Sequence, residues 1–200
     1  FLFYFSGNII WGYFAICFTT TSRTFLANSS IFGKVYFPRL TVPIANIIFG
    51  LFQFFLQFIF FIFFLIYFHI LGFEIQIDIA LLLLPLLLLQ TALLGLGIGL
   101  LICSLTTKYR DLNFVMEFVV QLWMFATPIV YPLSIVPEKF RLLISLNPMT
   151  SIVELFRYIF LSKGVINLEV ILISLSITII VFILGILNFN KVERNFMDTI

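Results

Sequence analysis

Side chains capable of catalysis are few and widely separated along this chain. The only histidine is His69, and the two cysteines, Cys17 and Cys103, lie in apolar runs without the spacing of a metal or redox site. An enzyme such as a glycosyl or acyl transferase needs a general base, a nucleophile or a metal cluster. The sequence shows no carboxylate pair and no histidine cluster, so it argues against an enzyme. We expect both cysteines to be packing residues.

The glycine cluster GLGIGL at 95–100 is the nearest approach to a phosphate-binding loop. A P-loop would follow the pattern G-x-x-x-x-G-K-[ST], which is absent, and the spacing is also wrong for a dinucleotide loop. Gly95 and Gly99 instead form a G-x-x-x-G pair, which permits two helices to approach closely. We therefore expect no ATP site, no cofactor and no metal in this chain.

The composition places these residues in a membrane. Hydrophobic residues make up 62% of the 200 and charged residues 10%, and the mean hydropathy is +1.21. A soluble domain has roughly 45–50% apolar and about 25% charged residues. The net charge of +2 is too small to suggest a nucleic-acid partner.

Five apolar runs approach the length of about 20 residues that a transmembrane helix needs. They cover 1–20, 43–68, 79–105, 113–131 and 168–189, and polar segments separate them at 21–41, 69–78, 106–112 and 132–167. We predict an all-α polytopic membrane protein in which 1–200 form a single transmembrane domain. Because Phe1 already lies in an apolar run and is not a Met, we expect the start of the natural protein to be missing.

The basic residues predict the orientation, because Lys and Arg accumulate in cytoplasmic loops. Most of the eleven fall in 21–41, in 106–112 and in the tail after the last span: Arg23, Lys34, Arg39, Lys108, Arg110, Lys191 and Arg194. The segment 69–78 carries no Lys or Arg, and the remaining four basic residues lie in 132–167. We therefore place 21–41 and the C-terminus in the cytoplasm and 132–167 outside.

The external segment begins where three prolines interrupt the chain, Pro128, Pro132 and Pro137. Asn147-Pro148 divides it into two amphipathic pieces, about 138–146 and 149–161, and neither is long enough to cross a bilayer. Irregular backbone at membrane depth is tolerated only where protein or a water-filled cavity satisfies its polar groups. We predict a re-entrant helical pair, hinged at the prolines, at the outer mouth of a pathway. An ordinary outer loop with interfacial helices is the alternative.

Polar side chains within the spans have structural and functional interpretations. Glu117 is the only acidic residue well inside a span, and either a proton relay or pairing with a neighbour such as Arg110 would explain it. A relay would favour an ion-coupled secondary transporter. Interhelical hydrogen bonds are the simplest explanation for four amides, Gln53, Gln57, Gln90 and Gln121.

Four stretches together resemble one family. They are KVYFPRL at 34–40, KYRDL at 108–112, QLWMFATPIVYPLSIVPEKFRLLISLNPM at 121–149 and VERNFMDTI at the C-terminus. The chain resembles, over essentially its whole length, the membrane permeases of ABC exporters that move polysaccharides and polyol phosphates such as O-antigen, capsule and teichoic acid precursors. Related drug-exporting permeases are an alternative. Family members have six spans after an amphipathic cytoplasmic helix, so the resemblance implies that this helix and the first span are absent here.

The resemblance also implies a coupling helix in the first cytoplasmic loop, at 28–40, that seats in a groove of an ATPase subunit. The candidate coupling residues are Phe32, Lys34, Val35, Tyr36, Phe37, Pro38 and Arg39, together with Arg110 and Asp111 of the second cytoplasmic loop. The aromatic and aliphatic members suit a docking surface, and the cations suit an acidic rim. Contact with lipid headgroups is the alternative for the first loop, and capping of the next helix is the alternative for Asp111.

A glycan pathway would favour aromatic side chains, because sugar rings present apolar C–H faces that stack on them. The candidates near the outer half are Tyr4, Trp11, Trp123, Phe125 and Tyr131, although an aromatic belt at the membrane interface would look the same. Gate or hinge candidates are the residues of the external segment: Pro128, Pro132, Pro137, Asn147, Pro148, Glu154 and Arg157. The expected assembly has two permease copies in a prokaryotic cytoplasmic membrane and two ATPases that bind ATP and magnesium. Its expected substrate is a lipid-linked polysaccharide.

Overall fold

The computed structural model describes residues 1–28, 38–72, 79–109, 111–162, 164 and 167–197. Within these ranges every regular element is a helix, which confirms the predicted all-α class. The elements are α1 (Leu2–Ser22), α2 (Thr24–Ala27), α4 (Thr41–Ile70), η1 (Ile79–Leu83), α5 (Leu84–Lys108), α6 (Leu112–Ala126), η2 (Leu133–Ile135), α7 (Glu138–Ser145), α8 (Pro148–Leu161) and α9 (Leu168–Met197).

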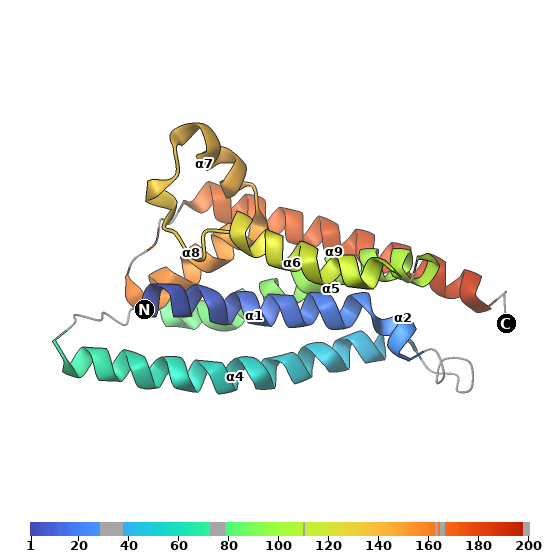
Figure 1. Ribbon diagram of the computed structural model, residues 1–200, viewed down its shortest axis with the longest axis horizontal. Helices are drawn as coiled ribbons and strands as arrows, with labels where there is room; N and C mark the ends of the chain where they lie inside the picture. Colours follow the sequence, from blue (N-terminus) through green and yellow to red (C-terminus); the bar gives the residue numbers. More distant parts are fainter. Residues whose placement is uncertain (29–37, 73–78, 110, 163, 165–166, 198–200) are drawn as a thin grey trace.

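The long helices run along one axis and alternate in direction (Figure 1). One end of the bundle holds α2, the connection from α5 to α6 and the C-terminus, and we call it the α2 end. The other holds the N-terminus, the end of α4, α7 and α8, and we call it the α7 end. This alternation agrees with the order of loops predicted from the apolar runs.

Four helices are long and apolar enough to cross a membrane: Leu2–Ser22, Thr41–Ile70, Ala80–Thr106 and Leu168–Val192. They match four of the five predicted spans. The remaining one, predicted at 113–131, is the shorter helix α6, which has 15 residues and ends at Ala126. At about 1.5 Å per residue α6 is roughly 22 Å long, less than the roughly 30 Å of a hydrocarbon core.

Helix α6 ends earlier than predicted because Pro128 follows Thr127. Proline disfavours helical geometry in the residue that precedes it, and Thr127, which precedes Pro128, is extended with φ −99° and ψ 139°. The two amphipathic pieces predicted beyond this break are present as α7 and α8, and Pro148 occupies the first helical turn of α8.

The core lies where α1, α5 and α8 meet. Gly95 and Gly99 let α1 and α5 approach closely, because a Cβ added at these positions would lie 2.7 Å from the Cβ of Cys17 and 2.6 Å from that of Thr21. Gly97 and Gly185 do the same for α5 and α9, since a Cβ at Gly185 would lie 2.5 Å from the Gly97 carbonyl oxygen. The expected close helix approach is confirmed. Cys17 and Cys103 are both buried and neither is in a disulfide bond, as expected of packing residues.

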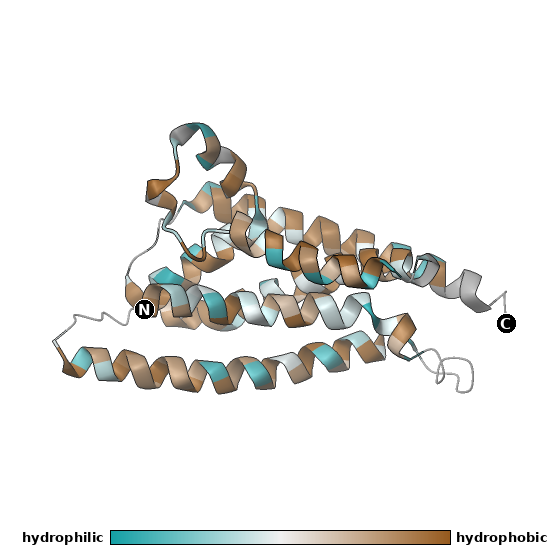
Figure 2. Cartoon of the chain, in the orientation of Figure 1, coloured by the Kyte–Doolittle hydropathy of each residue, from teal (hydrophilic) through white to brown (hydrophobic). Residues whose placement is uncertain are grey.

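Hydropathy is distributed unevenly among the helices (Figure 2). Helix α4 is mostly apolar and is crossed by a few hydrophilic bands, whereas α1 carries hydrophilic and intermediate residues along much of its length. Half of α1 is buried inside the bundle, compared with 17% of the most apolar stretch of α4. Helix α1 is therefore a central element, and α4 is a peripheral one.

Candidate functional site

The backbone break after α6 is the most elaborate polar site in the described part of the chain. Arg157 of α8, whose side chain is fully buried, donates from Nη1 to the carbonyl oxygen of Pro128 at 2.6 Å. It also donates from Nη2 to the carbonyl oxygen of Ile129 at 2.6 Å. Buried carbonyls need hydrogen-bond donors, and α8 supplies them for the break.

The same guanidinium reaches α1. Its Nε donates to the carbonyl oxygen of Phe3 at 3.3 Å, and its central carbon lies 3.7 Å from the centre of the Phe3 ring. Gly7 provides the space, because a Cβ there would lie 2.9 Å from Nη2. Glu154, one turn earlier on α8, accepts from Arg157 Nη1 at 3.1 Å and supplies the opposite charge. Arg157 thus joins α1, α8 and the break after α6 in one buried network.

Asn147 makes a second connection between α6 and α8. As the N-cap of α8 it accepts a hydrogen bond from the backbone N–H of Met149 at 3.1 Å. Its side-chain oxygen also accepts from Trp123 Nε1 at 3.3 Å, and its Nδ2 donates to the hydroxyl of Thr127 at 2.9 Å. The start of α8 is therefore fixed against the last turn of α6.

A third connection links the start of α8 to α9 and α5. Gln90 of α5 donates to the hydroxyl of Ser174 on α9 at 2.9 Å, and that hydroxyl donates to the carbonyl oxygen of Pro148 at 2.9 Å. The prediction of an interhelical hydrogen bond is confirmed for Gln90. The other three amides, Gln53, Gln57 and Gln121, make no hydrogen bond to another residue that the structure describes, so this expectation fails for them within those residues. They lie on sides of α4 and α6 that are not fully covered by other helices.

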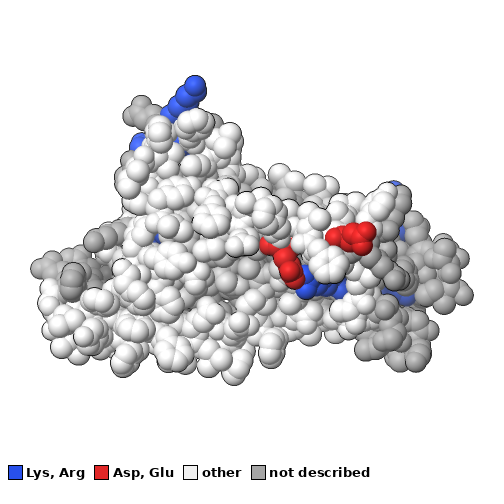
Figure 3. Space-filling model, viewed as in Figure 1, with Lys and Arg blue, Asp and Glu red and all other residues white. Residues whose placement is uncertain are grey.

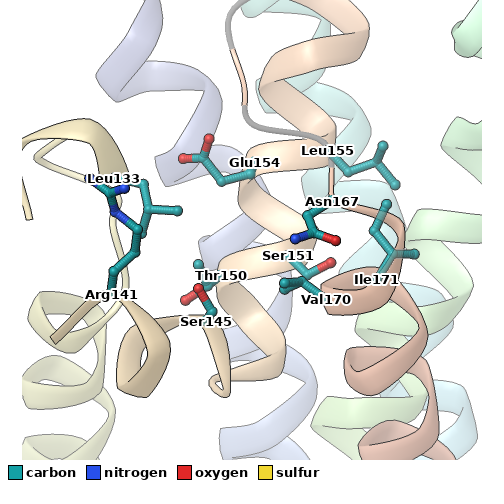
Figure 4. A pocket seen from close by; sticks show the side chains of 10 residues that line it. All are labelled: Leu133, Arg141, Ser145, Thr150, Ser151, Glu154, Leu155, Asn167, Val170 and Ile171. Atoms are coloured by element: carbon teal, nitrogen blue, oxygen red, sulfur yellow. The ribbon is translucent and has the colours of Figure 1, made fainter. Parts of the chain in front are cut away.

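A cavity of about 110 Å³ opens between α7, α8 and the start of α9 (Figure 4). Its polar lining comes from Arg141, Ser145, Thr150, Ser151, Glu154 and Asn167, and its apolar lining from Leu133, Leu155, Val170 and Ile171. One water needs only roughly 10–15 Å³ of such space. The cavity therefore admits a few waters or one small polar group, and it is too small to be a conduit for a polymer.

The gate candidates divide into two groups. Pro128, Asn147, Pro148, Glu154 and Arg157 belong to the network just described. Pro132 is half-buried and Pro137 is exposed, and they lie on either side of η2, outside that network. A gating or hinge role stays a prediction for all seven.

The pathway candidates also divide. Trp11 is 4% exposed and lies inside the bundle, where its ring is 6.2 Å from that of Trp123. Tyr4 and Phe125 are 44% and 59% exposed, and Tyr131 is half-buried with its hydroxyl donating to the Phe125 carbonyl at 3.3 Å. Substrate contact stays a prediction for the five aromatic residues, and only Tyr4 and Phe125 among them are exposed in this chain.

Most coupling candidates lie outside the described residues: Phe32, Lys34, Val35, Tyr36, Phe37 and Arg110. Of the others, Pro38 accepts hydrogen bonds from the backbone N–H and the hydroxyl of Thr41, which fixes the start of α4. Arg39 is 4% exposed and its guanidinium lies 6.0 Å from the centre of the Phe25 ring. Asp111 stands at the N-cap position of α6 without a side-chain capping bond, so the capping alternative is not realised here.

Glu117 has a partner that the sequence did not predict. Its carboxylate accepts a hydrogen bond from Arg23, which lies between α1 and α2, and the pair is exposed, with side-chain exposures of 39% for Arg23 and 63% for Glu117. Figure 3 shows these opposite charges together on the surface between α1 and α6, near the α2 end. The structural partner comes from the segment 21–41, which the sequence predicts to be cytoplasmic. Arg110, the partner named from the sequence, lies outside the described ranges.

Comparisons with known proteins give a consistent result. Residues 2–161 match the model of a family described as ABC-2 type transporter. An "O-antigen export system permease protein RfbA" from Klebsiella pneumoniae is 29% identical over 197 residues, which cover 98% of this chain and 74% of that protein. A protein of the same name from Myxococcus xanthus is 21% identical over 206 residues, with 99% and 75% of the two chains covered.

Proposed function

Since this chain belongs to the ABC-2 type transporter family, we propose that it is the membrane permease of an ATP-driven exporter of polysaccharide or lipid-linked glycan. The observation that carries this proposal is the similarity to O-antigen export permeases over 98% of the chain. The four long apolar helices and α6 support a multi-pass membrane protein. The absence of a P-loop from the sequence agrees with a subunit that depends on another protein for energy.

Membership of this family implies an ABC ATPase partner. In our proposal two ATPases bind ATP and magnesium, two copies of this chain form the conduit, and the assembly lies in the cytoplasmic membrane of a prokaryote. The α2 end faces the cytoplasm, because the predicted cytoplasmic residues Arg23, Arg39 and Lys191 gather there. The C-terminus is then cytoplasmic as well.

Helix α1 is the element best placed to carry a movement from the ATPase to the outer mouth. Near the α2 end Arg23 pairs with Glu117, and near the α7 end the Phe3 carbonyl is bonded to Arg157. A helix of 21 residues spans about 30 Å, so one rigid rod connects the two contacts. A shift of the first cytoplasmic loop would therefore reach the Arg157 network, and parting of α8 from α1 would open the outer end.

Co-purification tests this function with the complete natural protein expressed together with its candidate ATPase. We expect a Walker-type ATPase in equal amount after mild detergent extraction, and its loss when Phe37 and Arg39 are both replaced by Ala. Arg141→Ala is a control for the loss of an arginine at the other end of the bundle, where Arg141 is exposed on α7. If no ATPase is recovered while the permease remains dimeric, the proposal is wrong and an ion-coupled transporter takes its place. Recovery of the ATPase without glycan export would instead favour a drug exporter.

A further inference from the structure

The cavity of about 110 Å³ between α7, α8 and the start of α9 has no role in the function proposed above. Figure 4 shows that its polar side chains come from three separate helices or their ends. Arg141 and Ser145 lie on α7, Ser151 and Glu154 lie on α8, and Asn167 immediately precedes α9. We call this space the α7 cavity.

Ser151 is a buried side chain of the α7 cavity that lacks a protein partner. The residue is 7% exposed, and its hydroxyl hydrogen bonds to no other residue in the described part of the chain. The hydroxyl of Ser145 is likewise unbonded within the described ranges. The neighbouring hydroxyl of Thr150 differs, because it donates to the carbonyl oxygen of Ile144 at 2.7 Å. Buried hydroxyls are normally hydrogen-bonded, so the two serines indicate an occupant that bonds to them.

The unused hydrogen-bonding capacity of the α7 cavity consists mostly of donors. The guanidinium of Arg141 carries five N–H donors, and it makes one weak bond of 3.4 Å to a backbone carbonyl oxygen. The side-chain oxygen of Asn167 accepts from the backbone N–H of Glu169 at 3.0 Å, which leaves its two amide donors for the cavity. The carboxylate of Glu154 already accepts a bond from Arg157. The α7 cavity therefore suits an occupant that is rich in acceptors.

The charges of the lining favour an anion. Arg141 and Glu154 are the charged side chains among the described residues that line the cavity. Arg157 compensates the charge of Glu154 at a distance of 3.1 Å, so Arg141 supplies a positive charge that the lining does not balance. Glu169 lies on the first turn of α9 but does not line the cavity. The planar guanidinium of arginine matches the oxygens of phosphate, so phosphate suits both the charge and the donors.

The position of the cavity along α9 indicates the source of the phosphate. The stretch Leu168–Val192 is long and apolar enough to cross a membrane, and Asn167 immediately precedes it. Val170 and Ile171, in the first turn of this stretch, also line the cavity. Lipid headgroups flank a hydrocarbon core of roughly 30 Å, within a total thickness of about 40–45 Å. The α7 cavity therefore lies at the level of the lipid phosphates at the α7 end.

We propose that the α7 cavity binds the phosphate of a membrane phospholipid. Arg141 makes the charged contact, and Ser145, Ser151 and Asn167 supply further donors. The cavity has space for this one polar group, and the acyl chains stay outside it. A phosphate held there joins α7 to α8 and to the start of α9, and so stabilises the arrangement of the α7 end. The inference depends on the membrane position of α9 and not on which substrate is exported.

Lipid binding by the purified protein tests this site. The complete natural permease and its ATPase would be purified in a non-ionic detergent without phosphate and titrated with dioleoylphosphatidylglycerol, and bound lipid would be counted by native mass spectrometry. We expect Arg141→Gln to weaken the tightest binding about tenfold, because charge-assisted hydrogen bonds to phosphate are lost. Lys139→Gln is the matched control, since Lys139 is exposed on the same helix and does not line the cavity. Equal weakening by the two variants would overturn the proposal, because it would show a general attraction of α7 for anionic lipid.

A second pair of variants separates the cavity from the surface around it. Ser151→Leu places an apolar side chain in the cavity and keeps Arg141, and we expect it to weaken binding at least as much as Arg141→Gln. Ser176→Leu makes the same change at an exposed position of α9 and should leave binding unchanged. Equal binding by the two Leu variants would mean that lipid contacts Arg141 outside the cavity, which would also overturn the proposal.

Unfolding temperatures distinguish lipid phosphate from other occupants. Without lipid, the unmodified protein, Arg141→Gln and Lys139→Gln should unfold at the same temperature, because Arg141 makes only one weak bond. Phosphatidylglycerol should raise the unfolding temperature of the unmodified protein and of Lys139→Gln, and that of Arg141→Gln by about half as much or less. A diacylglycerol glucoside, which has acyl chains and no phosphate, should act equally on all three.

Two results of the unfolding experiment would contradict a lipid site. A rise that depends on Arg141 and occurs with inorganic phosphate, but not with phosphatidylglycerol, would place free phosphate in the cavity. The absence of any rise that depends on Arg141 would leave water as the occupant.

Discussion

Two arginine–glutamate pairs lie near opposite ends of α1 and differ in their surroundings. Arg157 and Glu154 have side-chain exposures of 0% and 8%, whereas Arg23 and Glu117 have 39% and 63%. Arg157 also satisfies three backbone carbonyls, while Arg23 bonds to Glu117 on the surface. The same two residue types thus form a buried, multiply hydrogen-bonded ion pair at the α7 end and an exposed ion pair near the α2 end.

An exporter of the proposed kind would need this difference in burial between the two ion pairs, because one end must stay closed while the other moves with its partner. A buried ion pair is strongly destabilised when one partner is removed, because a charge is left without compensation. An exposed pair contributes little to stability and can break and re-form during movement. We therefore expect the α7 end to keep one stable closed arrangement until α1 moves, and the α2 end to adjust readily to its partner.

The largest expected effect comes from Arg157→Met. It would remove the buried positive charge beside Glu154 and the hydrogen bonds from Arg157 to the carbonyls of Pro128 and Ile129, and we expect the free energy of unfolding to fall by about 3–5 kcal/mol. The measurement is unfolding in mixed detergent micelles followed by circular dichroism. Arg141→Met is the control, because Arg141 is exposed and makes only a weak bond of 3.4 Å to the Val136 carbonyl. Equal stability of the two variants would show that the buried Arg157 network does not stabilise the α7 end.

A smaller effect is expected from Asn147→Ala, which removes the cap of α8 and the bonds to Trp123 and Thr127. We predict a loss of about 1–2 kcal/mol in the free energy of unfolding. Asn167→Ala offers a matched comparison, since Asn167 is exposed and accepts a single bond from the Glu169 N–H near the start of α9. A loss for Asn147→Ala no larger than for Asn167→Ala would contradict the second connection between α6 and α8.

The smallest effect is expected at the exposed pair. Arg23→Gln should change the free energy of unfolding by no more than about 1 kcal/mol, and the change should shrink further as salt screens the pair. A double-mutant cycle with Glu117→Gln measures the coupling between the two side chains. A coupling energy comparable to that of Arg157 and Glu154 would remove the distinction between the two ends.

Much of the fold was predictable because it depends on local patterns. The apolar runs gave the four long helices and α6, and Asn147-Pro148 correctly divided α7 from α8. The spacing of Gly95 and Gly99 predicted a close helix contact that the structure confirms. The predicted span at 113–131 extended too far because its hydrophobicity continues past Ala126, whereas the Pro128 restriction on Thr127 ends the helix.

The site was less predictable because its partners are far apart in the sequence. Arg157 bonds to carbonyls 28, 29 and 154 positions away, and no spacing rule relates these residues. The signal that the sequence did offer was an arginine among Ile, Phe and Leu near membrane depth, which must find acceptors. The partner of Glu117 likewise became visible only when the helices were packed together.

The most direct test of function is transport by purified components. The complete permease and its ATPase would be reconstituted into liposomes, and transfer of a lipid-linked glycan across the bilayer would be followed with a lectin confined to one side. We predict transfer that requires ATP and a hydrolysis-competent ATPase and that is lost when Phe37 and Arg39 are replaced by Ala. ATP hydrolysis at the normal rate without any glycan transfer would contradict a polysaccharide exporter.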